Sequence, residues 1–320
     1  MFEVLDLTAD GKLVPSTGDA AVALPPEGTV RWIDLVAPDP GALALLKERF
    51  GFHSLALSDC ADYGLESKVD DYDDHLFVVI HGFSAVKDQP YEIQIHEVHA
   101  FLGERYLVTV HDNKLPALDD IWAKAAASPA VLERGPSWAL YQQIDAMVDA
   151  TEPLVDRLAE VLDELETRII EHEHVVLDLS PVFKGRRSAA AMSRVLEPLR
   201  DTVRTLHRHP DSRITPRTAQ YLRDVADHVA RLAKRVADVS DQCHNIIAAY
   251  QALQTSRTNE VMKRLTIFSA VFLPLGFIVG FFGQNFTGLP MGDDRWMWAM
   301  LASMVVVPAG LLWWIKARWL

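Results

Sequence analysis

The fold is decided by residues 216–282, which read PRTAQYLRDVADHVARLAKRVADVSDQCHNIIAAYQALQTSRTNEVMKRLTIFSAVFLPLGFIVGFF. Apolar side chains recur there at steps of three and four residues, the heptad pattern of a helix that packs one seam against neighbouring helices. The seam consists of Leu222, Val225, Val229, Leu232, Val236, Val239, Cys243, Ile246, Tyr250 and Leu253. No glycine or proline occurs between Arg217 and Leu273, so we expect one helix, about 100 Å long at 1.5 Å per residue. Most of it must stand outside a hydrocarbon layer that is roughly 30 Å thick.

Two segments without a charged side chain are each long enough to span a bilayer. They are residues 265–282 and 296–315, and the alternative is a buried helix hairpin of a soluble protein. Lys263 and Arg264 precede the first segment, and a tail rich in tryptophan and basic residues ends the second. The connecting loop, residues 283–295, holds two aspartates beside one arginine. The positive-inside rule then predicts a multi-pass protein of the cell (inner) membrane with both termini in the cytoplasm.

The first 135 residues carry the signals of a mixed α/β unit. A helix that opens at Pro38-Asp39-Pro40 is stopped by Gly51. Three partly alternating apolar runs follow it, separated by polar or turn-rich segments, and such runs are typical of adjacent strands in one sheet. These runs are residues 75–83, 93–102 and 106–111.

Two amphipathic helices come next. One is expected to run without interruption from Trp138 to about His172, and the next from Ser180 to about His207. The expected fold class is thus an α/β cytosolic domain with a long stalk helix and two transmembrane helices. The expected divisions are an α/β domain at 1–135, antiparallel helices at 136–215, the stalk helix at 216–282 with its transmembrane part at 265–282, a loop at 283–295, a second transmembrane helix at 296–315 and a tail at 316–320.

Composition limits the classes of function. The net charge of −13 argues against a general nucleic-acid binder and suits cations better. Cys60 and Cys243 are the two cysteines and lie far apart in sequence, which excludes a disulfide framework and a thiolate zinc site. The first residues lack a basic segment followed by an apolar core, so we expect no cleaved signal peptide.

A stripe of small and weakly polar residues runs along one face of the first span. Because its steps are three or four residues, the members share that face, while Phe268, Phe272 and Phe277 are expected to point elsewhere. Two helices cannot enclose a pore, so any conduction needs several copies around an axis, and the heptad seam offers a means of assembling them. The alternative is a helix-packing face. The stripe consists of Asn259, Met262, Leu265, Ser269, Leu273, Gly276 and Gly280.

The first part of the loop after the first span is uncharged. No acidic or basic side chain occurs between Leu265 and Met291, so a passing cation would meet carbonyls, amides or water. Oxygen donors of this kind suit a hard divalent ion that dehydrates reluctantly. The alternative is a tight turn between two spans, where glycine and asparagine are common.

No sequence motif indicates an enzyme. His96-Glu97-Val98-His99 has the wrong histidine spacing for a helical zinc site and lies on a predicted strand. The acidic residues between 152 and 173 are most simply a hydrated helix face, or else a field that concentrates cations. We therefore expect neither catalytic residues nor a catalytic cofactor.

The segment TNEVMKRLTIFSAVFLPLGFIVGFFGQNF, residues 258–286, closely resembles the first transmembrane segment and signature loop of CorA-type divalent-cation channels. WIDLVAPDP, HSLALSDC and YDDHLFVVIHGF are similar to the cytosolic domain of that family, so the resemblance covers nearly the whole chain. It implies a CorA-like homopentameric membrane protein with a funnel-shaped α/β cytosolic domain. The long stalk helix would continue as the pore-lining span, with the second span packed outside it.

The resemblance also implies site residues. The Gly-Met-Asn signature of the family falls on Gly283, Gln284 and Asn285, with glutamine in place of methionine. The ZntB-like, zinc-transporting branch also varies that position. In the family, the asparagine and nearby backbone oxygens hold a hydrated cation at the pore entrance. The hydrophobic constriction matches Met262 and Leu265, with Asn259 just inside.

A regulatory metal site is implied as well. YLRDVADH, residues 221–228, resembles the family segment that bears a metal site between subunits. Asp224 would be one ligand, and its partner on the neighbouring subunit would lie near Asp88.

Three functions remain open. The first is a pentameric channel or transporter that imports Mg²⁺, and also Co²⁺ or Ni²⁺, with the divalent cation as both substrate and regulatory ligand. The second is a proton-coupled Zn²⁺ transporter of the ZntB type. The third is a membrane-anchored sensor or scaffold that transports nothing. The expected partners are further copies of the chain, membrane lipid and divalent cations, and no nucleic acid.

Overall fold

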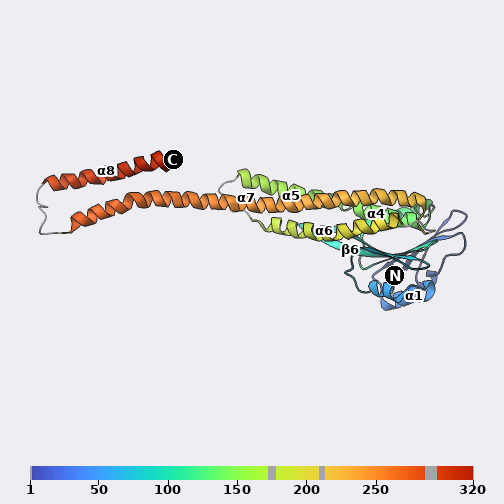
Figure 1. Ribbon diagram of the computed structural model, residues 1–320. Coiled ribbons are helices and arrows are strands. Elements are labelled where there is room, and N and C mark those ends of the chain that lie inside the picture. The colour runs from blue at the N-terminus through green and yellow to red at the C-terminus, as the bar shows by residue number, and fades with distance from the viewer. Residues whose placement is uncertain (1, 172–177, 209–212, 285–293, 320) are drawn as a thin grey trace. The chain divides into compact units, whose positions relative to one another are not determined.

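The computed structural model describes residues 2–171, 178–208, 213–284 and 294–319 (Figure 1). The chain divides into two compact units, Met1–Ile247 and Ala248–Leu320. The helix α7 (Pro216–Gly283) contributes residues to both units.

A seven-stranded sheet forms the centre of the first unit. Its order is β2-β1-β3-β7-β6-β5-β4, and all neighbours are antiparallel except the parallel pair of β3 and β7. The three apolar runs predicted to be adjacent strands form β5, β6 and β7, which confirms that prediction. The strands are β1 (Phe2–Leu7), β2 (Leu13–Thr17), β3 (Val30–Val36), β4 (Lys68–Asp71), β5 (Leu76–Val86), β6 (Gln89–Leu102) and β7 (Tyr106–His111).

One face of the sheet is covered by α1 (Pro40–Phe50) and α2 (Ser54–Asp59) (Figure 1). The carboxylate of Asp39 caps α1 by accepting a hydrogen bond from the backbone N–H of Ala42 at 2.7 Å. Gly51 ends α1 with φ 73, the left-handed conformation that glycine adopts without strain. Beneath the helices, the rings of Phe52 and Phe101 stack with centroids 4.0 Å apart. The predicted helix and its stop at Gly51 are confirmed.

The opposite face carries α3 (Pro116–Ala127), α4 (Pro136–Asp149) and α6 (Ser180–His207) (Figure 1). Trp32 of β3 meets Trp122 of α3 edge to face, with ring centroids 4.6 Å apart. The indole N–H of Trp32 also donates to Thr109 Oγ1 of β7 at 3.0 Å, so this buried polar atom is satisfied. The first unit is therefore a three-layer α/β/α arrangement. Two short 3-10 helices, Asp19–Ala21 and Pro129–Val131, lie in its connections.

The single helix expected from Trp138 to His172 is wrong, because the chain breaks between α4 and α5 (Glu152–Glu171). Pro153 lacks a backbone N–H, and its ring conflicts with a helical carbonyl four residues earlier, at Asp149. Thr151 Oγ1 donates to the carbonyl of Met147 at 2.9 Å and satisfies the end of α4. Residue 172 lies outside the described residues.

The heptad seam of α7 packs inside the chain. Its eight members from Leu222 to Ile246 are buried within the first unit alone. At Gly185 of α6, a Cβ atom would lie 4.0 Å from both Cys243 Sγ of α7 and Leu162 Cδ2 of α5, so the three helices meet there. The suggestion that this seam assembles copies is therefore wrong for Leu222 to Ile246, because helices of the same chain already cover it.

The second unit holds the remainder of α7 and the helix α8 (Asp294–Trp319). Both helices are long and apolar enough to cross a membrane, with mean hydropathies of 2.3 and 1.8 over their most apolar windows, and neither window is buried. Pro274 lies inside α7 and Pro308 inside α8. Prolines at such depth are tolerated in transmembrane helices.

Candidate ion pathway

The stripe predicted for the first span lies on α7, and its side chains are exposed within the chain. Met262, Leu265 and Leu273 each expose more than half of their surface. The complete stripe, all of it exposed, is Asn259, Met262, Leu265, Ser269, Leu273, Gly276 and Gly280.

Glycines open a hollow along this stripe. Ser269, Leu273 and Gly276 line a shallow depression of about 570 Å³ together with Phe272 and Phe277. A Cβ atom added at Gly276 would have no atom of another described side chain within 4 Å, apart from those of its two chain neighbours. Phe272 and Phe277, which were expected to point elsewhere than the stripe, thus also contribute to the lining of this depression. A face of this shape can contact water or a second copy of the chain.

The described part of the signature loop is short. Helix α7 ends at Gly283, and the backbone N–H of Gln284 donates to the carbonyl of Phe281 at 3.3 Å. Gly283 and Gln284 are both exposed. Asn285 lies outside the described residues, so its role as the first cation ligand stays a prediction.

Asp224 lies on an exposed face of α7 in the first unit. Its charge acts on Asp145 of α4, whose pKa is raised mainly by burial, then by Asp149, with Asp224 as a further contributor. Tyr141 donates a hydrogen bond to Asp145 Oδ2 at 3.2 Å, which opposes part of this rise. Asp224 thus belongs to an acidic surface that repels additional negative charge and favours cations.

Asp88 lies in the exposed turn between β5 and β6, with φ 59. Near Asp88 in sequence, the carbonyl of Tyr91 accepts a hydrogen bond from the hydroxyl of Ser188 at 2.7 Å. Ser188 lies on α6 less than one helical turn from Gly185, which faces Cys243 of α7. Asp224 precedes Cys243 by 19 residues, about 28 Å along α7. The two carboxylates are therefore not brought together within one chain.

No group of three or more histidine, cysteine, aspartate or glutamate side chains in the described ranges is arranged to hold a metal ion. The pairing of Asp224 with Asp88 was expected between subunits, so it stays a prediction.

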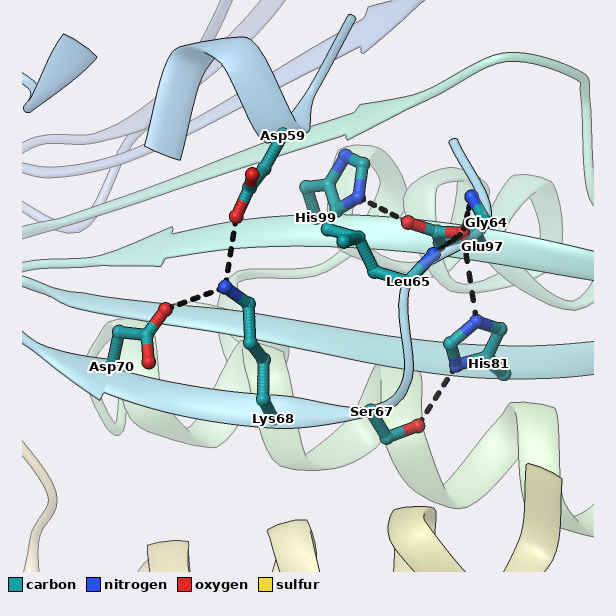
Figure 2. A network of polar contacts seen from close by, with 9 residues as sticks. All are labelled: Asp59, Gly64, Leu65, Ser67, Lys68, Asp70, His81, Glu97 and His99. Carbon is teal, nitrogen blue, oxygen red and sulfur yellow. Dashed lines mark hydrogen bonds and ion pairs between the residues drawn. The ribbon is translucent and has the colours of Figure 1, made fainter. Parts of the chain in front are cut away.

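A buried carboxylate instead fastens the loop after α2 to the sheet (Figure 2). Glu97 accepts hydrogen bonds from the backbone N–H groups of Gly64 at 2.7 Å and Leu65 at 3.1 Å. His99 Nε2 lies 2.7 Å from one carboxylate oxygen, and His81 Nε2 lies 3.7 Å from the other. We call these contacts the Glu97 clasp. Burial alone would raise the pKa of Glu97, but its contacts with His81 and His99 and the hydrogen bond from Gly64 outweigh burial and hold the pKa far below its usual range.

The alternation of β6 explains why His96-Glu97-Val98-His99 is no metal motif. Residues three apart on a strand point to opposite faces. His99 is buried on the α1 and α2 side with Glu97, whereas His96 Nε2 pairs with Ser84 Oγ at 2.7 Å. The two histidines of the motif therefore cannot share one ion.

Two ion pairs of Lys68 lie close to the same loop, at the edge of the sheet (Figure 2). Lys68 Nζ lies 2.8 Å from Asp59 Oδ2 and 2.8 Å from Asp70 Oδ2. Lys68 and Asp70 belong to β4, and Asp59 ends α2, so these contacts tie the edge strand to the helix layer. Together with the Glu97 clasp they give this polar cluster a structural role.

Comparisons with known proteins cover nearly the whole chain. The sequence model of the CorA-like Mg²⁺ transporter protein family matches residues 27–317. The cobalt/magnesium transport protein CorA of Thermotoga maritima is 27% identical over 327 residues, which cover 100% of this chain and 92% of that one. The zinc transport protein ZntB of an Enterobacter species (strain 638) is 27% identical over 242 residues, 71% of this chain and 69% of that one.

The fold is also that of a solved transporter. The CorA magnesium transporter from Methanocaldococcus jannaschii matches with a TM-score of 0.84 at 18% identity, and the match covers 98% of each chain. At that identity the likeness concerns the fold, an α/β unit with a long helix and two apolar helices. Membrane location follows from the family together with the two apolar helices. Because the family match spans all but the ends of the sequence, the chain belongs to the family of CorA-like Mg²⁺ transporter proteins.

Proposed function

We propose that this protein carries Mg²⁺, and with it Co²⁺ or Ni²⁺, into the cytoplasm through a pore enclosed by the α7 helices of five copies. The observation that carries the proposal is the exposed small-residue stripe of α7, which has a hollow at Ser269, Leu273 and Gly276. One chain offers two spans, which cannot surround an aqueous path. A ring of copies turns the stripes toward a common axis.

The parts of this pore would differ in chemistry. At one end, the backbone and amide oxygens of Gly283, Gln284 and Asn285 would hold a cation that keeps its inner waters. At the other end, Met262 and Leu265 would form a hydrophobic ring that closes the path by dewetting. An inside-negative potential supplies about 2.3 kcal/mol per charge per 100 mV, and thus about twice that for a divalent ion. No catalytic cofactor is required.

The orientation follows from charge. Lys263 and Arg264 precede the first span, and Lys316 and Arg318 follow the second, so the positive-inside rule favours a cytoplasmic location for both termini. The acidic first unit would then face the cytoplasm of the cell, below its inner membrane. There, a divalent cation would bridge Asp224 to the neighbouring copy's Asp88. Because the cation would bind the closed arrangement of the copies more tightly than the open one, it would favour the closed arrangement.

A proton-coupled Zn²⁺ transporter is the second candidate. Two observations favour it: Gln284 replaces the methionine of the family signature, and a zinc transport protein is 27% identical over most of the chain. Magnesium uptake follows the membrane potential alone, whereas coupled zinc uptake also follows a pH gradient.

Uptake into proteoliposomes tests both candidates. Full-length protein is reconstituted, a potassium diffusion potential is set negative inside, and Mg²⁺ or Zn²⁺ uptake is followed with an enclosed indicator, with and without a pH gradient. We expect potential-driven Mg²⁺ uptake that Asn285→Ala reduces at least tenfold, while Asn113→Ala, an exposed asparagine of the first unit, leaves it unchanged. Zinc uptake that scales with the pH gradient would favour the second candidate. The absence of any divalent flux would refute both and leave a sensor or scaffold.

A further inference from the structure

The second unit contains a groove between α7 and α8 that borders the stripe of α7 at Asn259 and Met262 and extends away from it toward α8. Its volume is about 360 Å³, and its lining is mostly apolar. Apart from these two stripe residues, the groove is lined from α7 by Lys263, Thr266, Ile267 and Ala270, and from α8 by Trp314 and Ile315.

The groove lies where the two apolar helices begin to enter the membrane. Lys263 precedes the charge-free run of α7 by two residues, and Ile315 is the last residue of the charge-free run of α8. From Lys263 to Ala270 the helix advances about 10 Å. The groove therefore combines a cation at the aqueous boundary with an apolar wall that reaches into the hydrocarbon layer. Tryptophan at such a boundary sits at the level of lipid headgroups.

Basic side chains outnumber acidic ones at this end of the second unit. Lys263 forms no ion pair with the carboxylates of the described residues, and its neighbour Arg264 already pairs with Glu260 at 2.7 Å. Between residues 248 and 320, Glu260 is the acidic residue at this end of the spans, since the two aspartates lie in or beside the connecting loop. Five basic residues share the end: Arg257, Lys263, Arg264, Lys316 and Arg318.

We propose that this groove binds an anionic phospholipid, with the headgroup phosphate at Lys263 and one acyl chain along Ile267 and Ala270. Basic pockets between transmembrane helices bind anionic headgroups by this combination of charge and apolar contact. The second unit of another copy is a poorer occupant, because it brings the same excess of positive charge to the same level. A lipid supplies the missing anion. The proposal rests on membrane location and not on ion transport, so it can fail or hold independently of the proposed function.

Native mass spectrometry of the full-length protein in detergent tests the proposal directly. The probes are phosphatidylglycerol and phosphatidylcholine with identical acyl chains, titrated separately, and the readout is the number of lipids bound per chain at each concentration. We expect phosphatidylglycerol to bind more tightly. Lys263→Gln should weaken its binding about fivefold, the effect of one basic residue near an anionic headgroup, and leave phosphatidylcholine unaffected. Arg295→Gln removes the same charge at the opposite end of α8 and should change neither.

A second variant examines the apolar wall. Ala270→Phe fills the groove with a side chain that a membrane helix tolerates, and it should abolish binding of both lipids, with helix content checked by circular dichroism. Equal binding of the two lipids to the wild type, or unchanged phosphatidylglycerol binding by Lys263→Gln, would overturn the proposal. So would a change in the number of copies caused by Ala270→Phe without loss of lipid, because a second copy would then occupy the groove. Inorganic phosphate that binds at Lys263 as tightly as phosphatidylglycerol would also overturn it.

Discussion

Removing the carboxylate of Glu97 should destabilise the first unit strongly. In Glu97→Ala, the backbone N–H groups of Gly64 and Leu65 and the Nε2 atom of His99 lose their acceptor. Glu97 and His99 are buried. Breaking a buried charged hydrogen-bond network by deleting one partner costs about 3–5 kcal/mol. For a unit of this size, that loss lowers the midpoint of thermal unfolding by about 6–20 °C.

Tryptophan fluorescence of the full-length protein in detergent measures this midpoint, since Trp32 is buried in the core of the first unit and Trp122 packs against it. The matched control is Glu92→Ala on the same strand. Glu92 pairs with Lys184 at 3.1 Å, and both side chains are well exposed, so its loss should cost about 0–1 kcal/mol. Equal midpoints for Glu97→Ala and Glu92→Ala would refute the structural role of the clasp.

The dependence on pH provides an independent readout with Glu97→Gln, which keeps the shape of the side chain and removes its charge. The pKa of Glu97 is lowered in the folded state from an ordinary value of 4.5. Its contribution is therefore fully present above pH 4.5 and is lost progressively as the pH falls below that value. The stability gap between wild type and Glu97→Gln should be constant from pH 7 to about pH 5 and narrow at more acid pH. A gap that widens below pH 4.5 would contradict the assignment.

Three further predictions concern other residues. Both side-chain amide atoms of the fully buried Gln143 lack a hydrogen-bond partner within the described chain, so Gln143→Met should raise the free energy of unfolding by about 1–3 kcal/mol; a loss in chemical denaturation would contradict this. Burial would lower the pKa of His111, but Asp34 and the Asn113 carbonyl raise it; Asp34→Asn should therefore lower the thermal midpoint most below pH 6.5 and less as the pH rises through the raised pKa. Asp224→Ala should keep magnesium influx high when the liposome interior holds millimolar Mg²⁺, and unchanged inhibition would remove Asp224 from regulation.

Periodicity predicted which face of α7 is buried but not what covers it. The steps from Leu222 to Ile246 require an apolar partner, and a partner from the same chain satisfies them as well as a second copy does. Leu162 and Gly185 supply that partner here, and they are 81 and 58 residues away from Cys243 in sequence. Such distant pairings leave no trace in a local pattern. Pro153 is a different case, because its position alone could have predicted the end of α4.

The edge strands and the clasp illustrate the same limit. β4 has four residues with three charges and β2 contains Pro15, so both lack the apolar alternation that indicates a strand. The alternation of side chains along a strand is enough to predict that His96 and His99 point to opposite faces of the sheet. The acceptor role of Glu97, however, depends on Gly64, which lies 33 residues away.

In the membrane unit, the stripe of α7 could be derived from spacing alone, and its exposure agrees with that derivation. The lipid groove could not, because Lys263 and Trp314 belong to different helices. A pattern within one helix cannot indicate which residues of another helix lie opposite. The function of the stripe residues and of Asn285 rests on the flux experiments.

The buried seam of α7 also affects how the protein is made, because the ribosome releases α5 and α6 before the segment that covers them. Leu158 and Leu162 of α5 and Val203 of α6 are buried, and at Gly185 the seam of α7 closes over the α5–α6 pair. A nascent chain that stops short of Leu222 would present this apolar surface to solvent, where chaperones bind and aggregation begins. The segment that seals it, Leu222 to Ile246, ends fewer than twenty residues before the first span starts at Leu265. Completion of the soluble unit and delivery of the first span to the membrane are therefore nearly simultaneous steps in the biogenesis of this protein.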